Sequence, residues 1–475
     1  MWTQIGVWLH VVLGLAFGIR VLMRPRLEPS VRLAWVLMIE ALPVIGILGY
    51  LYFGEIRMSR GERQRRADIR DRLRGLRDRR PAPVVDAPSF AVPVLAANRA
   101  AGGFVPVGGN AFHLLPEDNS AMDELVAAID AAVDHVHLLF YIWLPDATGV
   151  RVAGAAARAA ARGVTVRVLV DALGSRGLVR SPHWGAMRAA GVLCHVAGPI
   201  RLPLVQALIQ RVDLRNHRKI VVIDDATGMT GSRNCASTAF AVKPRFAPWI
   251  DVMLRVRGPV VRQMQGVFLQ DWMSATGEDL GAMLTRDPPH AAGPAIAQVV
   301  ATGPDVRRGS LADCMATMIH AARWSVTIST PYYVPDAALD AAIRGAALRG
   351  VRVTLILPAR NDSLLVGATS EGFFAGLAQA GVRLMLFGPG LLHAKIITVD
   401  GCMAMVGSAN LDRRSFELNY EMNMMILDAD AVGELDRRQA SYVARARPLR
   451  LGAIQRWSPW RRLRNNLLAL AAPLL

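Results

Sequence analysis

The feature that most constrains this chain is an internal duplication. Residues 112–146 and 314–336 each contain an apolar stretch of helical period and then a β-rich run that ends in Pro-Asp. In both copies a helix closed by glycine and a continuously apolar strand follow, as in ARAAARGVTVRVLVD and IRGAALRGVRVTLILP. This repeated order predicts α/β layers in two copies, with PAPVVDAPSFAVP as a linker before the first and DPPHAAGP as a joint between them.

Each copy then reaches a strand with the pattern His-x-Lys, which continues as His-x-Lys-x4-Asp-x6-Gly-Ser-x-Asn with identical spacing in both. The positions are His217, Lys219, Asp224, Gly231, Ser232 and Asn234, and His393, Lys395, Asp400, Gly407, Ser408 and Asn410. A lone His-x-Lys strand is most often ordinary surface, but a six-position pattern matched twice is improbable by chance. Lysine is also rare, because among 55 basic side chains it occurs only at Lys219, Lys243 and Lys395.

These residue types suit the chemistry of a phosphodiester. On a strand, residues i and i+2 face the same side, so each histidine projects together with its lysine. Neutral donors for a phosphate would come from Ser232, Asn234, Ser408 and Asn410. One imidazole can attack phosphorus while the other protonates the leaving oxygen, and lysine and asparagine stabilise the transition state. The chemistry needs no metal or other cofactor, and no cluster suited to a metal is visible in the sequence.

Several acids are candidates for supporting this site. Asp224 and Asp400 fall seven residues after their histidines, which puts them off the His/Lys face of a straight strand. We include them among the catalytic candidates, and a turn residue that bonds local backbone at the strand end is an equally open alternative. Each histidine also needs an acceptor for its second nitrogen. The candidates are acids set among apolar runs downstream: Asp251, Glu417 and Glu421.

The N-terminal end has a membrane-like composition. Residues 2–23 and 31–53 are apolar, and the second stretch would rise roughly 35 Å as one helix, enough for a hydrocarbon core of about 30 Å. We expect a transmembrane hairpin; a cleaved signal peptide is the alternative for the first stretch, which lacks a basic n-region. Eleven arginines and four acids follow between Arg57 and Arg80. Such a run beside a membrane is normally cytoplasmic and attracted to anionic lipid.

The length of the chain limits how many domains it can form, and its net charge indicates the kind of partner it binds. We expect residues 1–56 to form the hairpin, 57–100 a basic segment and linker, 101–286 the first repeat, and 295–475 the second repeat with the tail. The formal net charge of +17 implies an acidic partner, either nucleic acid or an anionic lipid surface. The four cysteines are widely and irregularly spaced, which argues against a zinc site or a disulfide framework.

The doubled His-x-Lys-x4-Asp pattern resembles the phospholipase D superfamily, and within it the chain is most similar to bacterial cardiolipin synthases. The resemblance covers nearly the whole chain and includes RNHRKIVVID, PWID, YYVPD and GSANLDRRSFELNYEMN. It departs at Asp118-Asn119, where the family usually has Asp-Gly. It implies an α/β fold of two phospholipase D-like α/β/α sandwich repeats with pseudo-twofold symmetry, preceded by an N-terminal transmembrane helical hairpin.

The resemblance also implies an activity and its residues. The enzyme would be a phosphatidyltransferase that makes cardiolipin and glycerol from two phosphatidylglycerol molecules through a phosphohistidine intermediate. His217 would be the nucleophile and His393 the acid and then the base, with the reverse assignment open because the motifs are symmetric. Glu421 would orient His217, and Asp251 would orient His393. The implied partners are anionic phospholipids, and the implied location is a bacterial inner membrane, multi-pass, with the catalytic body in the cytoplasm.

Three other functions fit part of the sequence. A hydrolytic phospholipase D differs only in whether water or a lipid hydroxyl resolves the intermediate. A phosphodiesterase acting on nucleic acid would use the same half-sites, but the hairpin and the placement of the charge argue against a nucleic-acid partner. A basic membrane scaffold without enzymatic activity would leave the duplicated motif unexplained.

Overall fold

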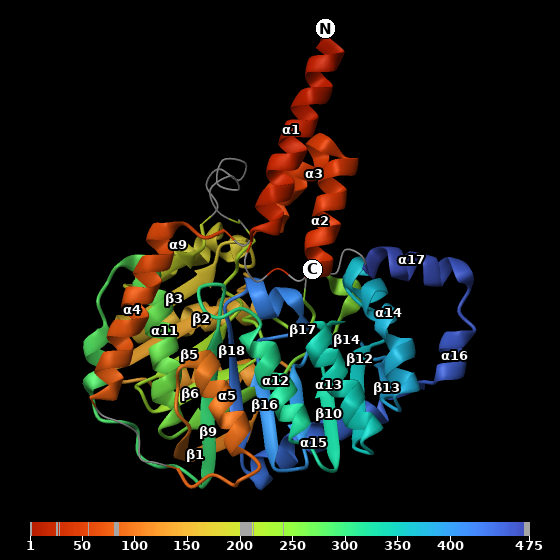
Figure 1. The fold of residues 1–475 in the computed structure, drawn as a ribbon. Coiled ribbons are helices and arrows are strands. Elements are labelled where there is room, and N and C mark those ends of the chain that lie inside the picture. Colours follow the sequence, from red (N-terminus) through yellow and green to blue (C-terminus); the bar gives the residue numbers. More distant parts are fainter. Residues whose placement is uncertain are drawn as a thin grey trace. The chain divides into compact units, whose positions relative to one another are not determined.

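The computed structural model describes residues 2–24, 27, 29–55, 57–79, 85–199, 211, 213–240 and 242–469. Its elements are drawn in Figure 1. The chain separates into two compact units. The first comprises residues 1–63 and 200–213, and the second comprises nearly all the others.

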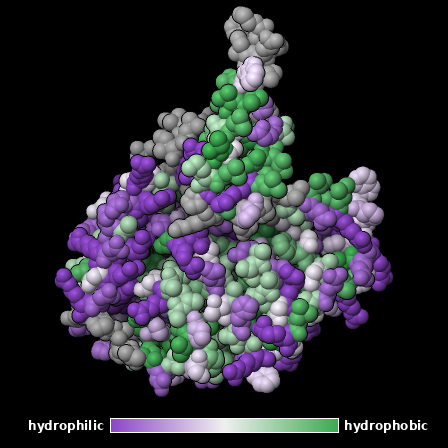
Figure 2. Space-filling model, in the orientation of Figure 1, coloured by the Kyte–Doolittle hydropathy of each residue, from purple (hydrophilic) through white to green (hydrophobic). Residues whose placement is uncertain are grey.

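The first unit is helical, with a 21-residue helix followed by shorter ones. They are α1 (Trp2–Leu22), α2 (Pro29–Ala41), α3 (Pro43–Gly49) and the π-helical turn η1 (Tyr50–Gly54). A proline at the first position of α3 has no N–H to bond to the preceding turn, so it starts a new helix instead of extending α2. A small core holds the unit together, formed by Val21, Val31, Trp35, Ile39 and Tyr50. Apolar side chains cover much of α1–α3 in Figure 2.

This break leaves the transmembrane hairpin predicted from residues 2–23 and 31–53 without support in its second stretch. The second stretch is divided among α2, α3 and η1, and the longest of these, α2, has 13 residues. In the part of the chain that the structure describes, no helix combines the length and the apolar character needed to cross a membrane.

The second unit is built on one large mixed sheet. Within the described residues, fifteen strands follow the order β19-β13-β12-β10-β15-β16-β18-β9-β1-β8-β6-β5-β2-β3-β4. In the first half these are β1 (Val107–Leu114), β2 (His135–Phe140), β3 (Thr165–Asp171), β4 (Leu193–Ala197), β5 (Lys219–Ile223), β6 (Thr227–Gly231) and β8 (Met253–Arg257). In the second half they are β9 (Ala295–Thr302), β10 (Ser325–Ser329), β12 (Arg352–Pro358), β13 (Arg383–Phe387), β15 (Ile396–Val399), β16 (Met403–Gly407), β18 (Glu421–Leu427) and β19 (Ala446–Leu449).

The strand order has a pseudo-twofold centre between β9 and β1. Counting outward from this antiparallel pair, β18 corresponds to β8, β16 to β6, β15 to β5, and β10 to β2. The outer parallel strands β12 and β13 likewise correspond to β3 and β4. The two His-x-Lys strands therefore occupy equivalent places in one sheet, and the α/β class predicted from the duplication is confirmed.

Helices cover both faces of this sheet. They are α4 (Arg60–Asp78), α5 (Val92–Gly102), α6 (Ser120–Asp130), α7 (Ala147–Ala161), α8 (Arg176–Val179), α9 (Pro182–Ala189), α11 (Val260–Thr276), α12 (Ser310–His320), α13 (Ala337–Leu348), α14 (Leu364–Gln379), α15 (Ala429–Ala444), α16 (Leu451–Gln455) and α17 (Pro459–Ala469). Short elements complete the unit: β7 (Trp249–Ile250), β11 (Tyr333–Val334), β14 (Leu391–Leu392), β17 (Leu411–Asp412), the 3-10 turns η2 (Pro244–Phe246) and η3 (Gly281–Thr285), and the π-helical turn η4 (Arg414–Leu418). Figure 1 shows α5, α12 and α13 over the strands of the second half.

The hydrophobic core joins the two halves on one face and separates them on the other. Along β18, Met422, Met424 and Ile426 point into a core that α11 and α15 cover and that extends across both halves. Met425 and Leu427 point the other way, into a core under α12, α13 and α14. The first half has its own core on that opposite face, under α6, α7 and α9. Because one core is continuous, the packing fixes the two His-x-Lys strands relative to each other.

Candidate active site

His217 immediately precedes β5, and the backbone of the opposite half holds it in place. Its N–H donates to the carbonyl of Tyr420 at 2.9 Å. Lys219 is the first residue of β5, is 2% exposed, and donates from Nζ to the carbonyl of His217 at 2.5 Å. The rest of β5, residues 220–223, is apolar and buried, and it anchors this polar pair at the start of the strand.

The second nitrogen of His217 meets a carboxylate from the other half of the chain. Nδ1 lies 3.0 Å from both Oε1 and Oε2 of Glu421, the first residue of β18. Glu421 is completely buried and also accepts a hydrogen bond from Asn419 Nδ2 at 3.2 Å. Because a carboxylate can only accept, Nδ1 carries the proton and the lone pair of His217 is on Nε2.

The second histidine has the reciprocal arrangement. His393 follows β14, whose partner strand is β7, and its N–H donates to the carbonyl of Ile250 at 2.8 Å. Its Nδ1 lies 2.7 Å from Oδ1 of Asp251, in the first half of the chain. Lys395 Nζ lies 3.0 Å from His393 Nε2 and donates to the His393 carbonyl at 2.7 Å. Each histidine is thus oriented by an acid of the opposite repeat.

The two serines of the motifs hold these acids. Ser232 Oγ donates to Asp251 Oδ1 at 2.6 Å and accepts from the N–H of Val252 at 3.0 Å. In the equivalent place Ser408 Oγ donates to Glu421 Oε2 and accepts from the N–H of Met422 at 3.0 Å. Both serines are completely buried. The hydroxyls of Ser232 and Ser408 are thus occupied behind the histidines, and their predicted role in phosphate binding stays a prediction.

A pocket of about 410 Å³ opens in front of the two histidines. Both imidazoles line it together with the two motif asparagines, Asn234 and Asn410. Asn234 accepts from the N–H of Ile142 at 3.2 Å through Oδ1, which leaves its amide NH2 for a ligand. The walls add arginine, apolar and aromatic side chains, including Arg215, Arg414, Val242, Val366, Tyr141 and Trp249. The pocket can hold a small anion with an apolar substituent attached.

Burial sets the protonation of the site. It lowers the pKa of His217 to about 4, although Glu421 opposes this shift. It also lowers the pKa of His393, and the charge of Lys395 acts in the same direction. Burial alone would raise the pKa of Glu421, but the charge and hydrogen bond of His217 hold it at about 2. Near neutral pH both imidazoles are therefore neutral and both carboxyl groups are ionised.

The lysines are shifted as well. Burial lowers the pKa of Lys219 to about 7 and that of Lys395 to about 8, with Glu421 and Asp251 respectively as the strongest opposing charges. A bound anion would restore the full charge of both lysines, because an opposite charge close by favours the protonated form. The site is poised to gain positive charge when an anion enters.

The two motif aspartates lie at the far ends of their strands, outside this pocket. Asp224 has a left-handed backbone (φ 53°), and its carboxylate accepts from the N–H groups of Val133, Asp134 and His135 at 2.8–3.0 Å. Asp400 (φ 52°) does the same with residues 323–325 at 2.7–2.8 Å. Both carboxylates therefore join two strands of the same repeat, and their direct participation in chemistry stays a prediction.

Other side chains of the site escaped the sequence analysis. Tyr141 packs edge-on against His217 with ring centroids 4.8 Å apart, and Trp249 packs against His393 at the same distance. The PWID stretch carries Trp249 two residues before Asp251, which was the available signal. Lys243 ion-pairs with Asp362 at 2.5 Å, and both line the pocket. Glu417 lies in η4 and is not the acid at His217 Nδ1, which is Glu421.

A mirrored α/β sheet with two crossed His–carboxylate pairs at one pocket defines an enzyme of the phospholipase D-like class. Residues 125–272 and 315–441 match the family described as "Cardiolipin synthase, PLD-like domain". The chain is 35% identical to cardiolipin synthase A of Pectobacterium carotovorum subsp. carotovorum (strain PC1), over 99% of this chain and 97% of the relative. Cardiolipin synthase A of Serratia proteamaculans (strain 568) is also 35% identical, with 100% and 98% covered.

Among solved structures, phosphatidylserine synthase of Haemophilus influenzae Rd KW20 has a similar fold, with a TM-score of 0.59 and 14% identity, over 80% of this chain and 100% of the other. The chain therefore belongs to the cardiolipin synthase family with phospholipase D-like domains.

Proposed function

We propose that this chain is a cardiolipin synthase that transfers a phosphatidyl group between two phosphatidylglycerol molecules. The observation that carries the proposal is the pair of crossed contacts, His217 with Glu421 and His393 with Asp251, beside one pocket. Full-length relatives named cardiolipin synthase A support the choice of reaction.

In the first step the neutral imidazole of His217 attacks phosphorus through Nε2. A nitrogen–phosphorus bond forms and the bond to the glycerol oxygen breaks. His393 takes up a proton when the anionic phosphodiester binds, because a nearby negative charge favours the protonated imidazole, and it gives that proton to the glycerol oxygen. Glu421 stabilises the positive charge that develops on the attacking ring, since it already accepts from Nδ1. The products of this step are glycerol and a phosphatidyl-histidine.

In the second step the same groups work in reverse. The now neutral His393 takes the proton from a hydroxyl of a second phosphatidylglycerol, whose oxygen attacks phosphorus. The nitrogen–phosphorus bond to His217 breaks, which releases cardiolipin and restores both histidines. The motif symmetry allows the two histidines to exchange roles, and trapping the intermediate decides between the assignments.

Lysine and asparagine would stabilise the five-coordinate transition state. Lys219 and Lys395 provide two compact positive charges, and Asn234 and Asn410 provide neutral donors at the pocket wall. We assign Ser232 and Ser408 to orienting the two acids, and Asp224 and Asp400 to the strand junctions. These steps use no metal, so the activity is expected to survive a chelator.

We further propose that the first unit attaches the enzyme to a lipid surface. Large apolar side chains on α1 are exposed, among them Trp8 (70%), Leu15 (59%) and Ile19 (56%), and Leu33 and Leu37 on α2 are equally open. Exposed apolar patches of this kind mark membrane or protein contacts. Replacing Leu15 and Ile19 by aspartate should reduce co-sedimentation with lipid vesicles; unchanged sedimentation would refute the attachment.

The central test follows phosphatidylglycerol carrying a ³²P label. Wild-type enzyme should form labelled cardiolipin and release glycerol, with or without a chelator. H217A should form neither product nor labelled protein, whereas H393A should retain slow labelling of His217. Labelled phosphatidic acid as the sole product would show a hydrolytic phospholipase D instead. Labelling in H217A but not in H393A would reverse the two roles.

A further inference from the structure

A second pocket lies in the second unit, separate from the one in front of His217 and His393. It measures about 300 Å³ and is bounded by α4, the end of α5, α11 and the loop after β9. The two pockets have no lining residue in common. Arg218, which lines this second pocket, directly follows His217 in the sequence.

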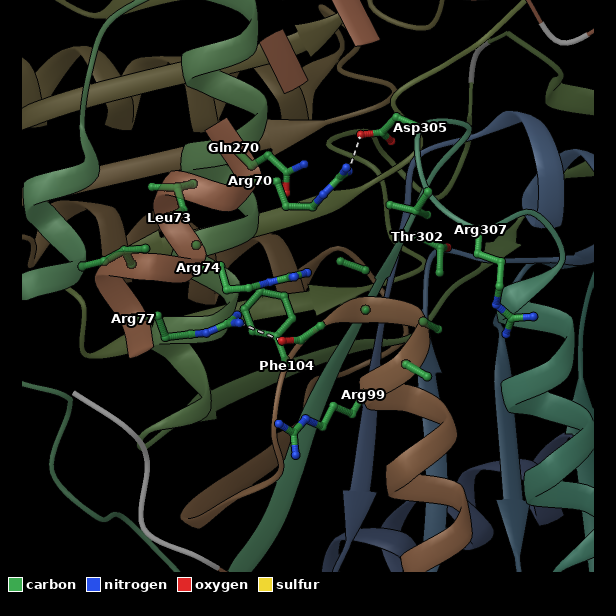
Figure 3. Close-up of a pocket in the computed structure, with 18 of the residues that line it drawn as sticks. Arg70, Leu73, Arg74, Arg77, Arg99, Phe104, Gln270, Thr302, Asp305 and Arg307 are labelled. Atoms are coloured by element: carbon green, nitrogen blue, oxygen red, sulfur yellow. Dashed lines mark hydrogen bonds and ion pairs between the residues drawn. The ribbon is translucent and has the colours of Figure 1, made fainter. Parts of the chain in front are cut away.

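One face of α4 supplies the basic wall. Arg70, Arg74 and Arg77 follow the i, i+4, i+7 spacing of a single helical face. Leu73 on the same face is buried in the core beneath α11 and fixes the helix against the sheet. In Figure 3 the three arginines project from α4 toward Phe104 and the loop that contains Asp305. Arg99 in the last turn of α5 adds a fourth guanidinium.

The positive charge of this wall is only partly balanced. Asp305 is the single carboxylate among the lining residues, and it pairs with Arg70 at 3.0 Å. Arg77 donates to the carbonyl of Gly103 at 2.7 Å and lies over the ring of Phe104. Within the described residues, neither Arg74 nor Arg99 forms an ion pair or a hydrogen bond, and both side chains are exposed at the pocket.

These arginines also repel one another. Burial lowers the pKa of Arg77, Asp78 opposes that shift, and the charges of Arg74 and Arg99 add to it. Holding like charges together has an electrostatic cost that a bound anion would remove. Several guanidinium groups lining one pocket suit a phosphate, because each can donate two parallel hydrogen bonds to its oxygens.

We propose that this pocket is an accessory binding site for a phosphate-bearing anion. Arg74 and Arg99 would bind the phosphate oxygens, with Arg77 adding positive charge beside them. The phosphate could belong to a lipid head group or to a soluble molecule, since both present the same oxygens. The site is independent of the phosphatidyl transfer proposed above, because it uses none of the side chains of that reaction.

The test is arginine modification by phenylglyoxal, read residue by residue by mass spectrometry on the full-length enzyme in uncharged detergent. Inorganic phosphate is one probe, and vesicles of phosphatidylcholine with or without phosphatidic acid are the other. Arg65 and Arg188 are the internal controls, being exposed arginines for which the described residues provide no ion pair. Chloride at equal ionic strength controls for screening.

We expect at least fivefold slower modification of Arg74 and Arg99 with a phosphate probe, and less than twofold change at Arg65 and Arg188. Protection by inorganic phosphate identifies a soluble ligand, whereas protection only by vesicles with phosphatidic acid identifies a lipid head group. Equal rates with and without either probe would overturn the proposal, as would equal protection of the controls. The modification rates do not depend on turnover, so they test this site even if the proposed phosphatidyl transfer does not occur.

As a second measurement, R74Q/R99Q should lose the additional retention that phosphatidic acid gives over phosphatidylcholine vesicles alone, or the phosphate-induced rise in melting temperature, while R65Q/R188Q keeps both. The two variants lose the same formal charge. If R74Q/R99Q and R65Q/R188Q change these two measurements equally, the effect comes from total charge, and the proposed site is wrong.

Discussion

At the scale of single residues, two of the three lysines are buried in a closed space beside the motif histidines. Lys219 and Lys395 are 2% and 3% exposed, and each Nζ already contacts a backbone carbonyl of its histidine. A guanidinium is larger, planar and permanently charged, so it can neither fit this space nor adjust its protonation. If these lysines bind the phosphate as proposed, the closed space around them explains why lysine is kept there in an arginine-rich chain.

K219R and K395R are therefore expected to lower kcat/KM by roughly 100-fold or more, the size of effect seen when one transition-state donor is lost. Steady-state conversion of labelled phosphatidylglycerol measures it. K243R is the comparison, since Lys243 is 41% exposed at the pocket rim and its ion pair tolerates a guanidinium. Near-normal turnover of K219R would contradict the role given to the buried ammonium.

The pH dependence should follow the same lysines. A lowered lysine pKa means that the charged form exists below the folded pKa and is lost as the pH rises through it. His393, the proposed acid, has a lowered pKa, and the folded pKa values are about 7 for Lys219 and about 8 for Lys395. We therefore expect kcat/KM to fall as the pH rises to 7 and beyond. It should also fall below about pH 4, where the free His217 becomes protonated.

Because kcat reports the bound complex, and a bound phosphodiester raises the pKa of the lysines, the alkaline fall in kcat should begin at higher pH than that in kcat/KM. Melting curves at each pH control for unfolding. A kcat/KM that stays level up to pH 10 would contradict the lowered lysine pKa values.

Local patterns revealed part of the site, and the rest depends on contacts far apart in sequence. The histidines, lysines and asparagines belong to one short motif, so strand geometry alone predicted that they lie together. The acids do not, because Glu421 is 204 residues from His217 and Asp251 is 142 residues from His393. Only the family resemblance supplied those pairs. The serines were assigned to phosphate because their burial behind the histidines is a tertiary property.

At the scale of elements, the two motif aspartates join strands. Each carboxylate binds three successive N–H groups at the start of the adjacent strand, β2 for Asp224 and β10 for Asp400. The left-handed backbone at both positions suits aspartate or asparagine. The duplicated Asp is thus part of the fold of each repeat, which explains why it shares the fixed spacing of the catalytic residues.

D224N and D400N should lower stability by about 1–3 kcal/mol each, because hydrogen bonds to a charged acceptor are lost while the backbone shape is kept. Thermal or urea unfolding measures this. The kcat of the folded fraction should stay within about twofold of wild type, since neither carboxylate lines the pocket. D86N, at an exposed position before α5, serves as the control. A large loss of kcat without loss of stability would restore these aspartates to the chemistry.

The boundaries of helices and strands were predictable where the local sequence sets them, and the larger units were not. The glycine-closed helices and buried strands were predictable because their period and caps are local. The long span expected over residues 31–53 was wrong because Leu42–Pro43 interrupts it, and hydropathy outweighed the proline in the prediction. The domain boundaries set from linkers stay a prediction, since a core that runs across both halves does not follow linker composition.

At the scale of the whole molecule, the active site exists only when the two repeats are joined. Besides the crossed His–carboxylate contacts, the ion pair of Lys243 in the first repeat with Asp362 in the second also links the repeats at the pocket. The Asp362 side chain is 3% exposed and also accepts from the hydroxyl of Tyr332 at 2.7 Å. The Asp362 carboxylate needs the charge of Lys243 and the hydroxyl of Tyr332, because moving a charge out of water costs free energy unless such partners offset it.

A double-mutant cycle measures this link. K243M leaves the Asp362 carboxylate buried without its cation and should destabilise the protein by about 1–3 kcal/mol, less than a fully buried pair because Lys243 is partly exposed. D362N removes the stranded charge, so K243M/D362N should be more stable than K243M, with a coupling energy of about 1 kcal/mol.

The matched comparison is the cycle R158M/D130N, an exposed pair within the first repeat whose coupling should stay below about 0.5 kcal/mol. Equal coupling in the two cycles would mean that Lys243 and Asp362 are an ordinary surface pair. A larger coupling at Lys243–Asp362 would show that the rim of the active site contributes to holding the two repeats together, as the crossed acids do in its interior.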